Sequence, residues 1–597
     1  MGGDSGVIIG VGGAAGDGIA STGETFAKIC ARNGLHVYAY NSYQSVIRGG
    51  HVYMQIRVAP EKVWTHGNSP HLVIALNQDT VERHGREITR GGGILFNSDK
   101  ITVKPDQLPQ DVKPFGLPVL TLAKNPLQQN VVALGALLYL LDLKIELLTE
   151  LLTQTFAKKG AAVIEQNVQA AQAGFAYAQE HFGPPNRQVV LGTKKRMLLT
   201  GNQAFAVAGL IAGCKFYSAY PMTPASSILH TLAKYAAKYG MVLKQAEDEI
   251  AAINMAIGAG HAGVRAMTGT SGGGFALMTE AIGMAGMTET PVVIIQAQRG
   301  GPSTGLPTKT EQGDLFQLLG ASQGEFPKAI LAPRTVEEAY AIIGEAFNIA
   351  EKYQCPVMIA SDLLLSEHQE TVEDLPTSFP IERGEVVNGT VSQTGEYQRF
   401  AITPSGVSPR ALPGHPGTIF TTASDEHDEE GIVISDVFTD PIRRFHMMNK
   451  RMRKMDGILH ELPLPTIEGP AKADLTLVGW GSTYHVLRET MDYLNAQGKP
   501  RVNLLTIRNL WPFQSAAVTQ LLQSAKQTLI VECNYSGQLA KLIRMETGIT
   551  LNFRLAKYDG EPFVPSQVIS AVQSVLSGKA QPVTAIHDDI PELVRHY

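Results

Sequence analysis

The N-terminal part of the chain alternates short apolar runs with glycine-rich turns and amphipathic stretches. The apolar run GVIIGVG at residues 6–12 leads through GAAGDGIASTG into the helical pattern ETFAKICARNG, and HVYAYNSYQ then predicts another strand. This order is the beginning of a βαβ unit. The apolar run VVALGALLYLL at 131–141 is well short of the roughly 20 residues that span a bilayer, so it predicts a buried helix. A break rich in Pro and Asn, FGPPNRQ, ends this first unit, which we place at residues 1–188.

Two further α/β units follow. In residues 195–365, the strand-like runs RAMTGTS, PVVIIQAQ and CPVMIAS alternate with small-residue helices, a pattern typical of a doubly wound parallel sheet. Residues 366–470 are rich in Pro, Gly and Glu, and loops of this length connect domains or cover a functional site. Residues 471–597 return to strands and helices around a glycine turn. The predicted fold class is therefore α/β, with three α/β domains.

Composition and charge limit the classes of function. The chain of 597 residues has 44% hydrophobic residues, 18% charged residues and 59 glycines, as expected of globular α/β domains. A net charge of -5, without clustered Lys and Arg, gives no positive surface for nucleic acid or an anionic membrane, so we expect neither as a partner. No basic flank precedes the first apolar run, and the four cysteines stand singly without a CxxC pair. We therefore expect a cytoplasmic chain that carries no metal cluster of its own.

The glycine-rich stretch GVGGAAGDGIASTG at residues 10–23 could place backbone N–H groups around a phosphate. It fits a dinucleotide fingerprint poorly. Its GDG triplet, followed by Asn41, superficially resembles the metal–diphosphate motif of thiamine diphosphate enzymes, but no second asparagine follows Asn41, so we interpret it as a different turn. A plain tight turn explains it about as well. Further on, Arg48 stands beside Gly49 and near Ser45, a setting that suits a phosphate, although an ordinary surface arginine remains an equal alternative.

Two loops of the second unit carry candidate ligand-binding side chains. In SAYPMTPAS, Thr223 lies between two prolines that stiffen the loop and can aim its hydroxyl, or the segment is an ordinary turn before a helix. In QAQRGGPSTGLPTKTEQGD, Arg299 and Thr308 follow an apolar strand, and ligands bind beyond the carboxyl ends of strands in doubly wound sheets. Arg299 is thus a candidate for binding a carboxylate, with a structural salt bridge as the alternative.

Three acids precede the small and apolar run in QAEDEIAAINMAIGAGHAG. Negative charge at a helix start explains Glu247 and Asp248. Glu249 begins the buried face of the predicted helix, where an unpaired carboxylate is costly unless a ligand or a donor satisfies it.

Together these motifs resemble the α subunit of 2-oxoacid:ferredoxin oxidoreductases, in the form with a γ-type domain fused at the N-terminus. VGGAAGDGIASTG and YQSVIRGGH are similar to the γ-type domain. YPMTPAS, EDEIAAINMAIGAGHAG, TSGGGFALMTE and QRGGPSTGLPT are similar to the pyrimidine-binding domain of thiamine diphosphate enzymes. VGWGS and NLWPFQ are similar to a transketolase C-terminal domain. The likeness spans almost the whole chain, and it favours the 2-oxoglutarate enzymes.

The resemblance implies thiamine diphosphate chemistry: a 2-oxoacid and coenzyme A are converted to an acyl-CoA and CO2, and ferredoxin is reduced. The reaction can also run reductively and fix CO2. It implies a β subunit that holds the diphosphate, Mg2+ and a [4Fe-4S] cluster, in an (αβ)2 heterotetramer. Pyruvate or a branched-chain oxoacid are alternatives to 2-oxoglutarate. A dehydrogenase E1 or transketolase-like enzyme, and a non-catalytic adaptor, are the alternative classes.

The resemblance also implies roles for individual residues. The pattern E(x8)G(x4)G, in which Gly258 and Gly263 follow Glu249, selects Glu249 as the catalytic acid that contacts N1′ of the aminopyrimidine. Glu247 is out of register with these glycines. The other implied contacts are Tyr220 and Pro221 with the cofactor, Thr223 and Arg299 with the oxoacid and Thr308 nearby, Asp425 or Asp428 in a covering loop, and Ser45 and Arg48 with coenzyme A. No metal ligand is expected in this chain.

Overall fold

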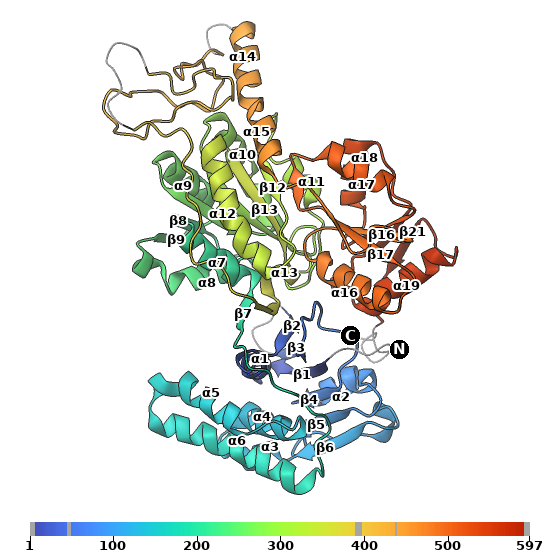
Figure 1. Cartoon of the computed structure of the whole chain (residues 1–597). Helices are drawn as coiled ribbons and strands as arrows, with labels where there is room; N and C mark the ends of the chain where they lie inside the picture. Colours follow the sequence, from blue (N-terminus) through green and yellow to red (C-terminus); the bar gives the residue numbers. More distant parts are fainter. Residues whose placement is uncertain (1–5, 45–48, 389–396, 436–438, 590–597) are drawn as a thin grey trace.

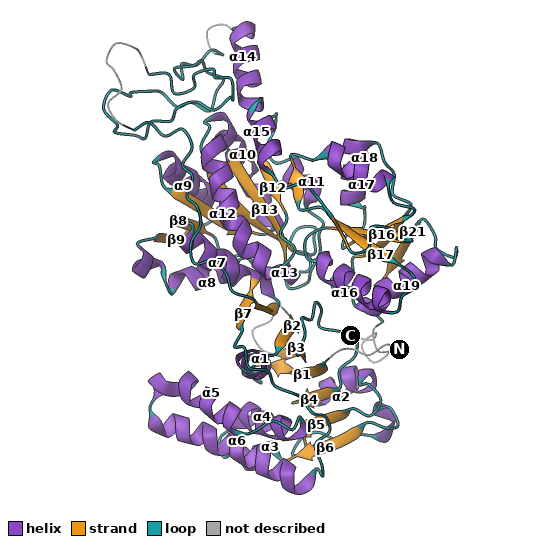
Figure 2. Ribbon diagram, in the orientation of Figure 1, coloured by secondary structure: helices purple, strands orange, loops and turns teal. Residues whose placement is uncertain are grey.

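The computed structural model describes residues 6–44, 49–388, 397–435 and 439–589. It contains three β-sheets, each covered by helices, and so confirms the predicted α/β class with three α/β units (Figure 1). Each of the three units contacts the other two, and helix α14 and its neighbouring loops project beyond the unit of the second sheet (Figure 2).

The first sheet has eight strands in the order β6-β5-β4-β1-β3-β2-β14-β7. Its first four strands are parallel, and each of the remaining neighbouring pairs is antiparallel. Strands β7 and β14 come from beyond residue 188. The hydrogen bonds of this sheet therefore extend beyond the first unit as we placed it from the sequence, at residues 1–188. The strands are β1 (Val7–Ala15), β2 (His36–Ser42), β3 (Gly49–Ala59), β4 (Leu72–Ala75), β5 (Gly93–Asn97), β6 (Lys113–Leu117), β7 (Met197–Thr200) and β14 (Gln369–Val372).

Two helices of the first unit are packed at backbone contact. The apolar run at 131–141 forms most of α4 (Gln129–Leu140), which is buried as predicted. A methyl group on Gly135 would lie 2.0 Å from the Ala171 carbonyl oxygen of α6 (Ala161–His181), and one on Gly174 would lie 2.0 Å from the Val132 carbonyl oxygen. Only glycine permits this approach of the two backbones. The other helices of this unit are α1 (Ile19–Arg32), α2 (Gln78–His84), α3 (Val119–Ala123) and α5 (Glu146–Phe156).

The second sheet has seven strands in the order β18-β12-β13-β11-β10-β8-β9, and all neighbours except β18 and β12 are parallel. Helices α7, α8 and α12 share one hydrophobic core with this sheet, while α9 and α10 share another. It is therefore doubly wound. The strands are β8 (Cys214–Ala219), β9 (Val242–Gln245), β10 (Arg265–Thr270), β11 (Val292–Gln298), β12 (Ala329–Leu331), β13 (Pro356–Asp362) and β18 (Asn509–Trp511). The helices are α7 (Gly201–Ile211), α8 (Ser226–Ala233), α9 (Glu249–His261), α10 (Gly272–Met287), α11 (Leu315–Leu319), α12 (Val336–Tyr353) and α13 (Leu363–Glu367).

The third sheet has six strands in the order β15-β17-β16-β19-β20-β21. The third unit also contributes β18 to the edge of the second sheet, which joins the two units through backbone hydrogen bonds. The strands are β15 (Ile467–Glu468), β16 (Leu475–Gly479), β17 (Val502–Thr506), β19 (Thr528–Glu532), β20 (Phe553–Lys557) and β21 (Val583–Ile586), and the helices are α16 (Thr483–Ala496), α17 (Ser515–Gln523), α18 (Gln538–Thr547) and α19 (Pro565–Leu576).

A buried ionic cluster anchors the connecting segment 366–470. Its helices α14 (Pro441–Met452) and α15 (Lys454–Glu461) supply Lys450 and Lys454, whose ammonium groups both contact the Glu289 carboxylate beyond α10. All three side chains are fully buried. Burial by itself would raise the pKa of Glu289, but the two ammonium groups hold it well below its ordinary value. Removing one partner of such a cluster would leave a buried charge unpaired.

Among the described residues, no helix combines the length and the apolar character needed to cross a membrane.

We predict that Gly174→Ala destabilises the first unit. The added methyl group must displace the Val132 carbonyl and separate α4 from α6, at a cost of about 1–3 kcal/mol. Urea unfolding of the purified chain should show an earlier transition. Gln172→Ala, at an exposed position of the same helix, should leave it within about 0.5 kcal/mol. An unchanged midpoint for Gly174→Ala would contradict the close packing.

Candidate active site

The candidate residues of the second unit lie beyond the carboxyl ends of neighbouring parallel strands. Tyr220 to Thr223 follow β8, Glu249 follows β9, and Arg299 follows β11. Strand β10, between β8 and β11, leads into the glycine-rich start of α10. Because parallel strands end at the same edge of a sheet, residues far apart in the sequence meet there, at the place where ligands bind in doubly wound folds.

Glu249 is the first residue of α9 and is 4% exposed. The preceding Asp248 caps the helix, because its carboxylate accepts the Ala251 N–H at 2.7 Å, whereas Glu247 is exposed. The Glu249 Oε1 atom is buried and accepts no hydrogen bond from the described residues. Burial raises the pKa of this carboxyl, and its own backbone N–H opposes the shift. Such an atom needs a donor or a proton from a ligand.

The start of α10 makes room for this carboxylate. A methyl group on Gly274 would lie 2.5 Å from Glu249 Oε1 and 2.2 Å from Thr270 Oγ1, so residue 274 must be glycine. The TSGGG motif is the signal in the sequence for this contact. Thr270 and Gly274, which sequence analysis did not single out, thus belong to the surroundings of Glu249.

The glycines behind Glu249 have different functions. Gly260 accommodates the Pro291 carbonyl oxygen, which would lie 2.3 Å from an added methyl group. Gly263 has a φ of +99°, in the left-handed region that favours glycine. Gly258 faces open space. Gly260 is therefore approached by another backbone segment of the described chain, while Gly258 has open space around it.

Arg299 and Thr223 meet as expected. The Arg299 Nη1 atom donates a hydrogen bond to the Thr223 carbonyl oxygen at 2.7 Å, which holds the guanidinium beside the loop after β8. Among the described residues this is the only hydrogen bond of that guanidinium, so its remaining N–H groups can bind an anion. Burial lowers the pKa of Arg299, and the charge of Asp314 opposes the shift. In the same loop, Tyr220 is 39% exposed and Pro221 is half-buried.

Two carboxyl groups that sequence analysis did not select lie in the segment between Arg299 and α11. Asp314 accepts a hydrogen bond from Gln296 Nε2 at 2.6 Å, and its charge interacts with Arg299. Glu311 lies against Gly300, because a methyl group on that glycine would be 3.2 Å from Glu311 Oε2. Burial, and after it the charge of Asp314, raises the pKa of Glu311 to about 7. In the sequence, the only indication of these two carboxyl groups was their place in the loop TKTEQGD after β11.

Thr308 has a different setting from the one expected. Its hydroxyl donates to the Tyr43 carbonyl oxygen at 2.8 Å, and the neighbouring Lys309 Nζ donates to Ser42 Oγ at 2.6 Å. Both residues therefore join the loop after β11 to the end of β2 in the first unit. Sequence spacing could not reveal this, since more than 260 residues separate the partners.

The predicted covering loop, which contains Asp425 and Asp428, is held by hydrogen bonds within the loop and to α14. Asp428 is buried, and its carboxylate accepts the N–H groups of Glu430 at 3.0 Å and Ile432 at 2.9 Å, and the Arg443 guanidinium at 2.8 Å. It closes the loop and ties it to α14. Asp425 is exposed. Ser45 and Arg48 lie outside the described residues, so their proposed contacts with coenzyme A stay predictions.

The GDG triplet in the first unit forms a tight turn. Asp17 Oδ2 accepts the Ala14 N–H at 2.8 Å, and Gly16 and Gly18 have φ angles of +107° and +80°. The carboxylate thus closes its own turn before α1, which agrees with our interpretation that it is not a metal–diphosphate motif.

Three family models match the chain in succession. Residues 8–177 match "Pyruvate ferredoxin/flavodoxin oxidoreductase", residues 208–443 match the thiamine diphosphate-binding region of pyruvate flavodoxin/ferredoxin oxidoreductase, and residues 473–568 match "Pyruvate:ferredoxin oxidoreductase core domain II". The second match includes Glu249, Thr223 and Arg299.

Relatives match nearly the full length. The chain is 30% identical to the alpha subunit of 2-oxoacid:ferredoxin oxidoreductase 2 of Aeropyrum pernix, over 97% of this chain and 99% of the relative. It is 32% identical to the 2-oxoglutarate oxidoreductase subunit KorA of Mycobacterium tuberculosis, over 96% and 92% of the two chains. The structure of 2-oxoglutarate:ferredoxin oxidoreductase from Magnetococcus marinus, described with 2-oxoglutarate, coenzyme A and succinyl-CoA bound, has 34% identity and a TM-score of 0.89 over 96% of this chain and 100% of that chain. The family predicted from the motifs is thus confirmed: the chain belongs to the 2-oxoacid:ferredoxin oxidoreductases, as a thiamine diphosphate-dependent alpha subunit.

Proposed function

We propose that this chain uses 2-oxoglutarate, interconverting it and coenzyme A with succinyl-CoA, CO2 and reduced ferredoxin. The observation that carries the assignment of the site is the buried Glu249 Oε1 atom without a hydrogen-bond donor among the described residues. The choice of 2-oxoglutarate is supported by two of the relatives, which carry this substrate in their names. Pyruvate and branched-chain oxoacids are the competing substrates.

Glu249 would hold the aminopyrimidine end of thiamine diphosphate. When bound, this cofactor supplies the acidic carbon that attacks the ketone and the ring that accepts the electrons released with CO2. The Glu249 carboxyl, whose pKa burial raises, can share a proton with the ring nitrogen N1′. The residues present fit this group, because the buried Oε1 atom lacks a hydrogen-bond donor among the described residues.

Arg299 and Thr223 would orient the oxoacid. The Arg299 guanidinium offers N–H groups to the substrate carboxylate, while its hydrogen bond to the Thr223 carbonyl keeps it in place. Tyr220 and Pro221, in the loop of Thr223, would contact the cofactor. Asp425, which is exposed, would contact the substrate from the covering loop, and Asp428 would shape that loop.

The rest of the reaction requires a partner. All four cysteines of this chain are buried and lie on or beside different helices and strands, with no CxxC pair, which is unsuited to an iron–sulfur cluster. We therefore assign the [4Fe-4S] cluster, Mg2+ and the diphosphate site to a β subunit, in an (αβ)2 assembly that reduces ferredoxin. The open space at Gly258 and the exposed Ile250 of α9 are where this partner would approach Glu249. The first unit would bind coenzyme A through Ser45 and Arg48.

A panel of oxoacids tests the substrate. The chain co-purified with its partner subunit should reduce ferredoxin or a viologen dye with 2-oxoglutarate and coenzyme A, with a kcat/KM at least tenfold above that for pyruvate or a branched-chain oxoacid. A higher value for pyruvate would overturn the assignment to 2-oxoglutarate but not the family.

Glu249→Gln tests the catalytic acid. The amide cannot share a proton with N1′ as a carboxyl does, so kcat should fall by about 10²- to 10⁴-fold while the subunits still co-elute in size-exclusion chromatography. Glu247→Gln, two residues away and exposed, should keep full activity. If Glu249→Gln also keeps full activity, Glu249 does not have this role.

The pH dependence of kcat/KM tests Glu311. Below pH 7 this carboxyl is protonated and neutral; above pH 7 it is an anion beside Gly300, the residue after Arg299, and repels the anionic oxoacid. The kcat/KM should therefore fall as pH rises through about 7, by about three- to tenfold, the effect of roughly 1 kcal/mol of charge repulsion. Glu311→Gln should remove this step, whereas exposed Glu325→Gln should keep it. An identical step in Glu311→Gln would assign it to another group.

A further inference from the structure

Three buried side chains with metal-binding atoms lie where the three units meet, away from Glu249 in the sequence and on other elements. His368 follows α13, Glu370 lies on β14 of the first sheet, and His485 lies on α16 of the third unit. Each is at most 2% exposed on its side chain. The ring of Tyr38, on β2, stacks on His368 with ring centroids 4.5 Å apart. Neither the proposed reaction nor the sequence motifs use this cluster.

The two imidazoles converge on one carboxylate oxygen. Glu370 Oε2 lies 3.0 Å from His485 Nε2 and 3.4 Å from His368 Nε2, and the three atoms all lie within 4.8 Å of one another. The other nitrogen of each ring faces a backbone carbonyl: His368 Nδ1 lies 2.6 Å from Leu364 O, and His485 Nδ1 lies 3.3 Å from Ser482 O. A carbonyl only accepts hydrogen bonds, so both Nδ1 atoms carry protons.

This arrangement needs a positive charge at its centre. With Nδ1 protonated, each neutral imidazole points the lone pair of Nε2 at a carboxylate, which is repulsive unless a proton or a cation lies between them. His368 Nε2 is buried and makes no hydrogen bond with the described residues. Zinc bonds of about 2.0–2.1 Å in a tetrahedron separate neighbouring ligand atoms by about 3.3 Å, close to the two measured edges.

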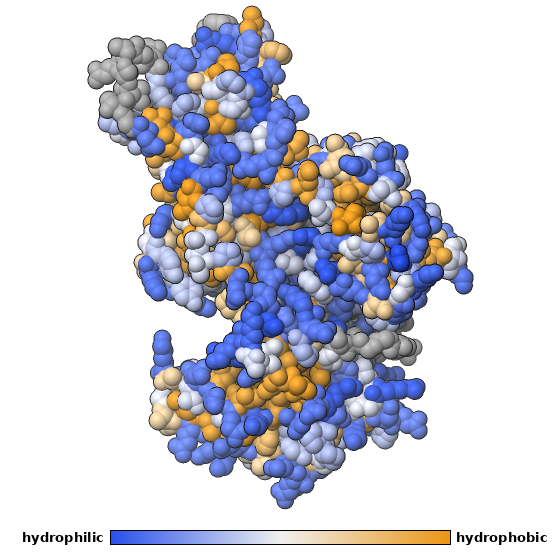
Figure 3. Space-filling view, in the orientation of Figure 1, coloured by the Kyte–Doolittle hydropathy of each residue, from blue (hydrophilic) through white to orange (hydrophobic). Residues whose placement is uncertain are grey.

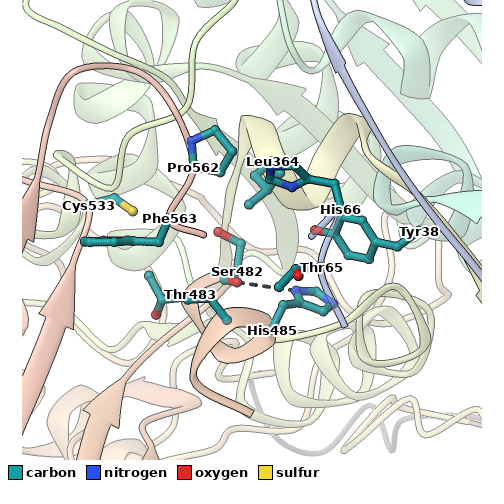
Figure 4. Close-up of a pocket in the computed structure, with 11 residues that line it drawn as sticks. Tyr38, Thr65, His66, Leu364, Ser482, Thr483, His485, Cys533, Pro562 and Phe563 are labelled. Atoms are coloured by element: carbon teal, nitrogen blue, oxygen red, sulfur yellow. Dashed lines mark hydrogen bonds between the residues drawn. The ribbon is translucent and has the colours of Figure 1, made fainter. Parts of the chain in front are cut away.

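We propose that His368, Glu370 and His485 bind a divalent transition metal ion, zinc by the chemistry of the donors. Each donor is oriented by the backbone as metal ligands are, since the Nδ1 atoms face carbonyls and Glu370 Oε1 accepts the Val336 N–H at 2.9 Å. His485 also borders a cavity of about 10 Å³, which is lined by Tyr38, Thr65 and His66 among others and has room for about one water molecule (Figure 4).

The ion would have a structural function. The site is closed to solvent and has no room for a substrate. It would connect the strand that returns from the second unit to the first sheet, through His368 and Glu370, with the first turn of α16 in the third unit. Metal binding of this kind adds its free energy to the docking of the units.

Metal analysis of the full-length chain, co-purified with its partner subunit, tests the proposal. We expect about one zinc per chain by mass spectrometry, removed slowly by a chelator and restored by added Zn2+. His485→Asn, His368→Asn and Glu370→Gln should each lower the zinc content at least tenfold. His460→Asn, the same substitution at an exposed histidine of α15, should keep it.

A substitution could lower the zinc content either by removing a ligand or by disturbing the fold. Cobalt replacement distinguishes these effects, because it uses the unaltered chain. Chelated chain loaded with Co2+ should show the visible absorption of a tetrahedral site, and added Zn2+ should abolish it. If the unaltered chain holds no more zinc than folded His485→Asn after dialysis against Zn2+, the proposal is overturned, and a protonated imidazole supplies the positive charge instead. This result would leave the proposed substrate unaffected, since the oxoacid panel measures a different site.

Discussion

The parallel hydrogen bonding of β8, β10 and β11 is the constraint on which the active site depends. It aligns the carboxyl ends of these strands, so that the loops after them, and the start of α9 after β9, share one edge of the sheet. Glu249, the Thr223 loop and Arg299 are brought together by this alignment rather than by nearness in sequence. Two groups at this edge then remain able to bind a ligand. Among the described residues, Glu249 Oε1 has no hydrogen-bond donor and the Arg299 guanidinium makes one hydrogen bond.

Buried ionic contacts also hold the units to one another. Glu289 pairs with Lys450 and Lys454 and so fixes the connecting segment to the second unit. Glu370 pairs with His485 across the junction of the first and third units. Apolar surface packs in many relative orientations, whereas a buried carboxylate is tolerated only where its partners reach it. The space-filling view shows mainly hydrophilic residues where the three units approach one another, while a large apolar area lies on the visible face of the first unit (Figure 3).

Much of the fold could be predicted because it depends on local patterns. Alternating apolar strands and small-residue helices indicated a doubly wound sheet, and the apolar run at 131–141 indicated a buried helix, as found in α4. Strands β7 and β14 were not assigned to the first sheet. Each has four residues. β14 pairs with β2, more than 300 residues away, and β7 pairs with β14, more than 160 residues away, so nothing in their own sequence indicates that sheet.

For the site, the sequence by itself determined which groups are available: an acid at the start of a helix, an arginine after a strand and glycines where backbones or a carboxylate approach closely. Only the tertiary structure decided how those groups are used. It placed the Glu249 carboxylate against Gly274, directed the Thr308 hydroxyl to Tyr43 and the Asp428 carboxylate to its own loop, and raised the pKa of Glu311. The physical reason is that burial and hydrogen-bond partners depend on distances across the fold, which residue order alone does not specify.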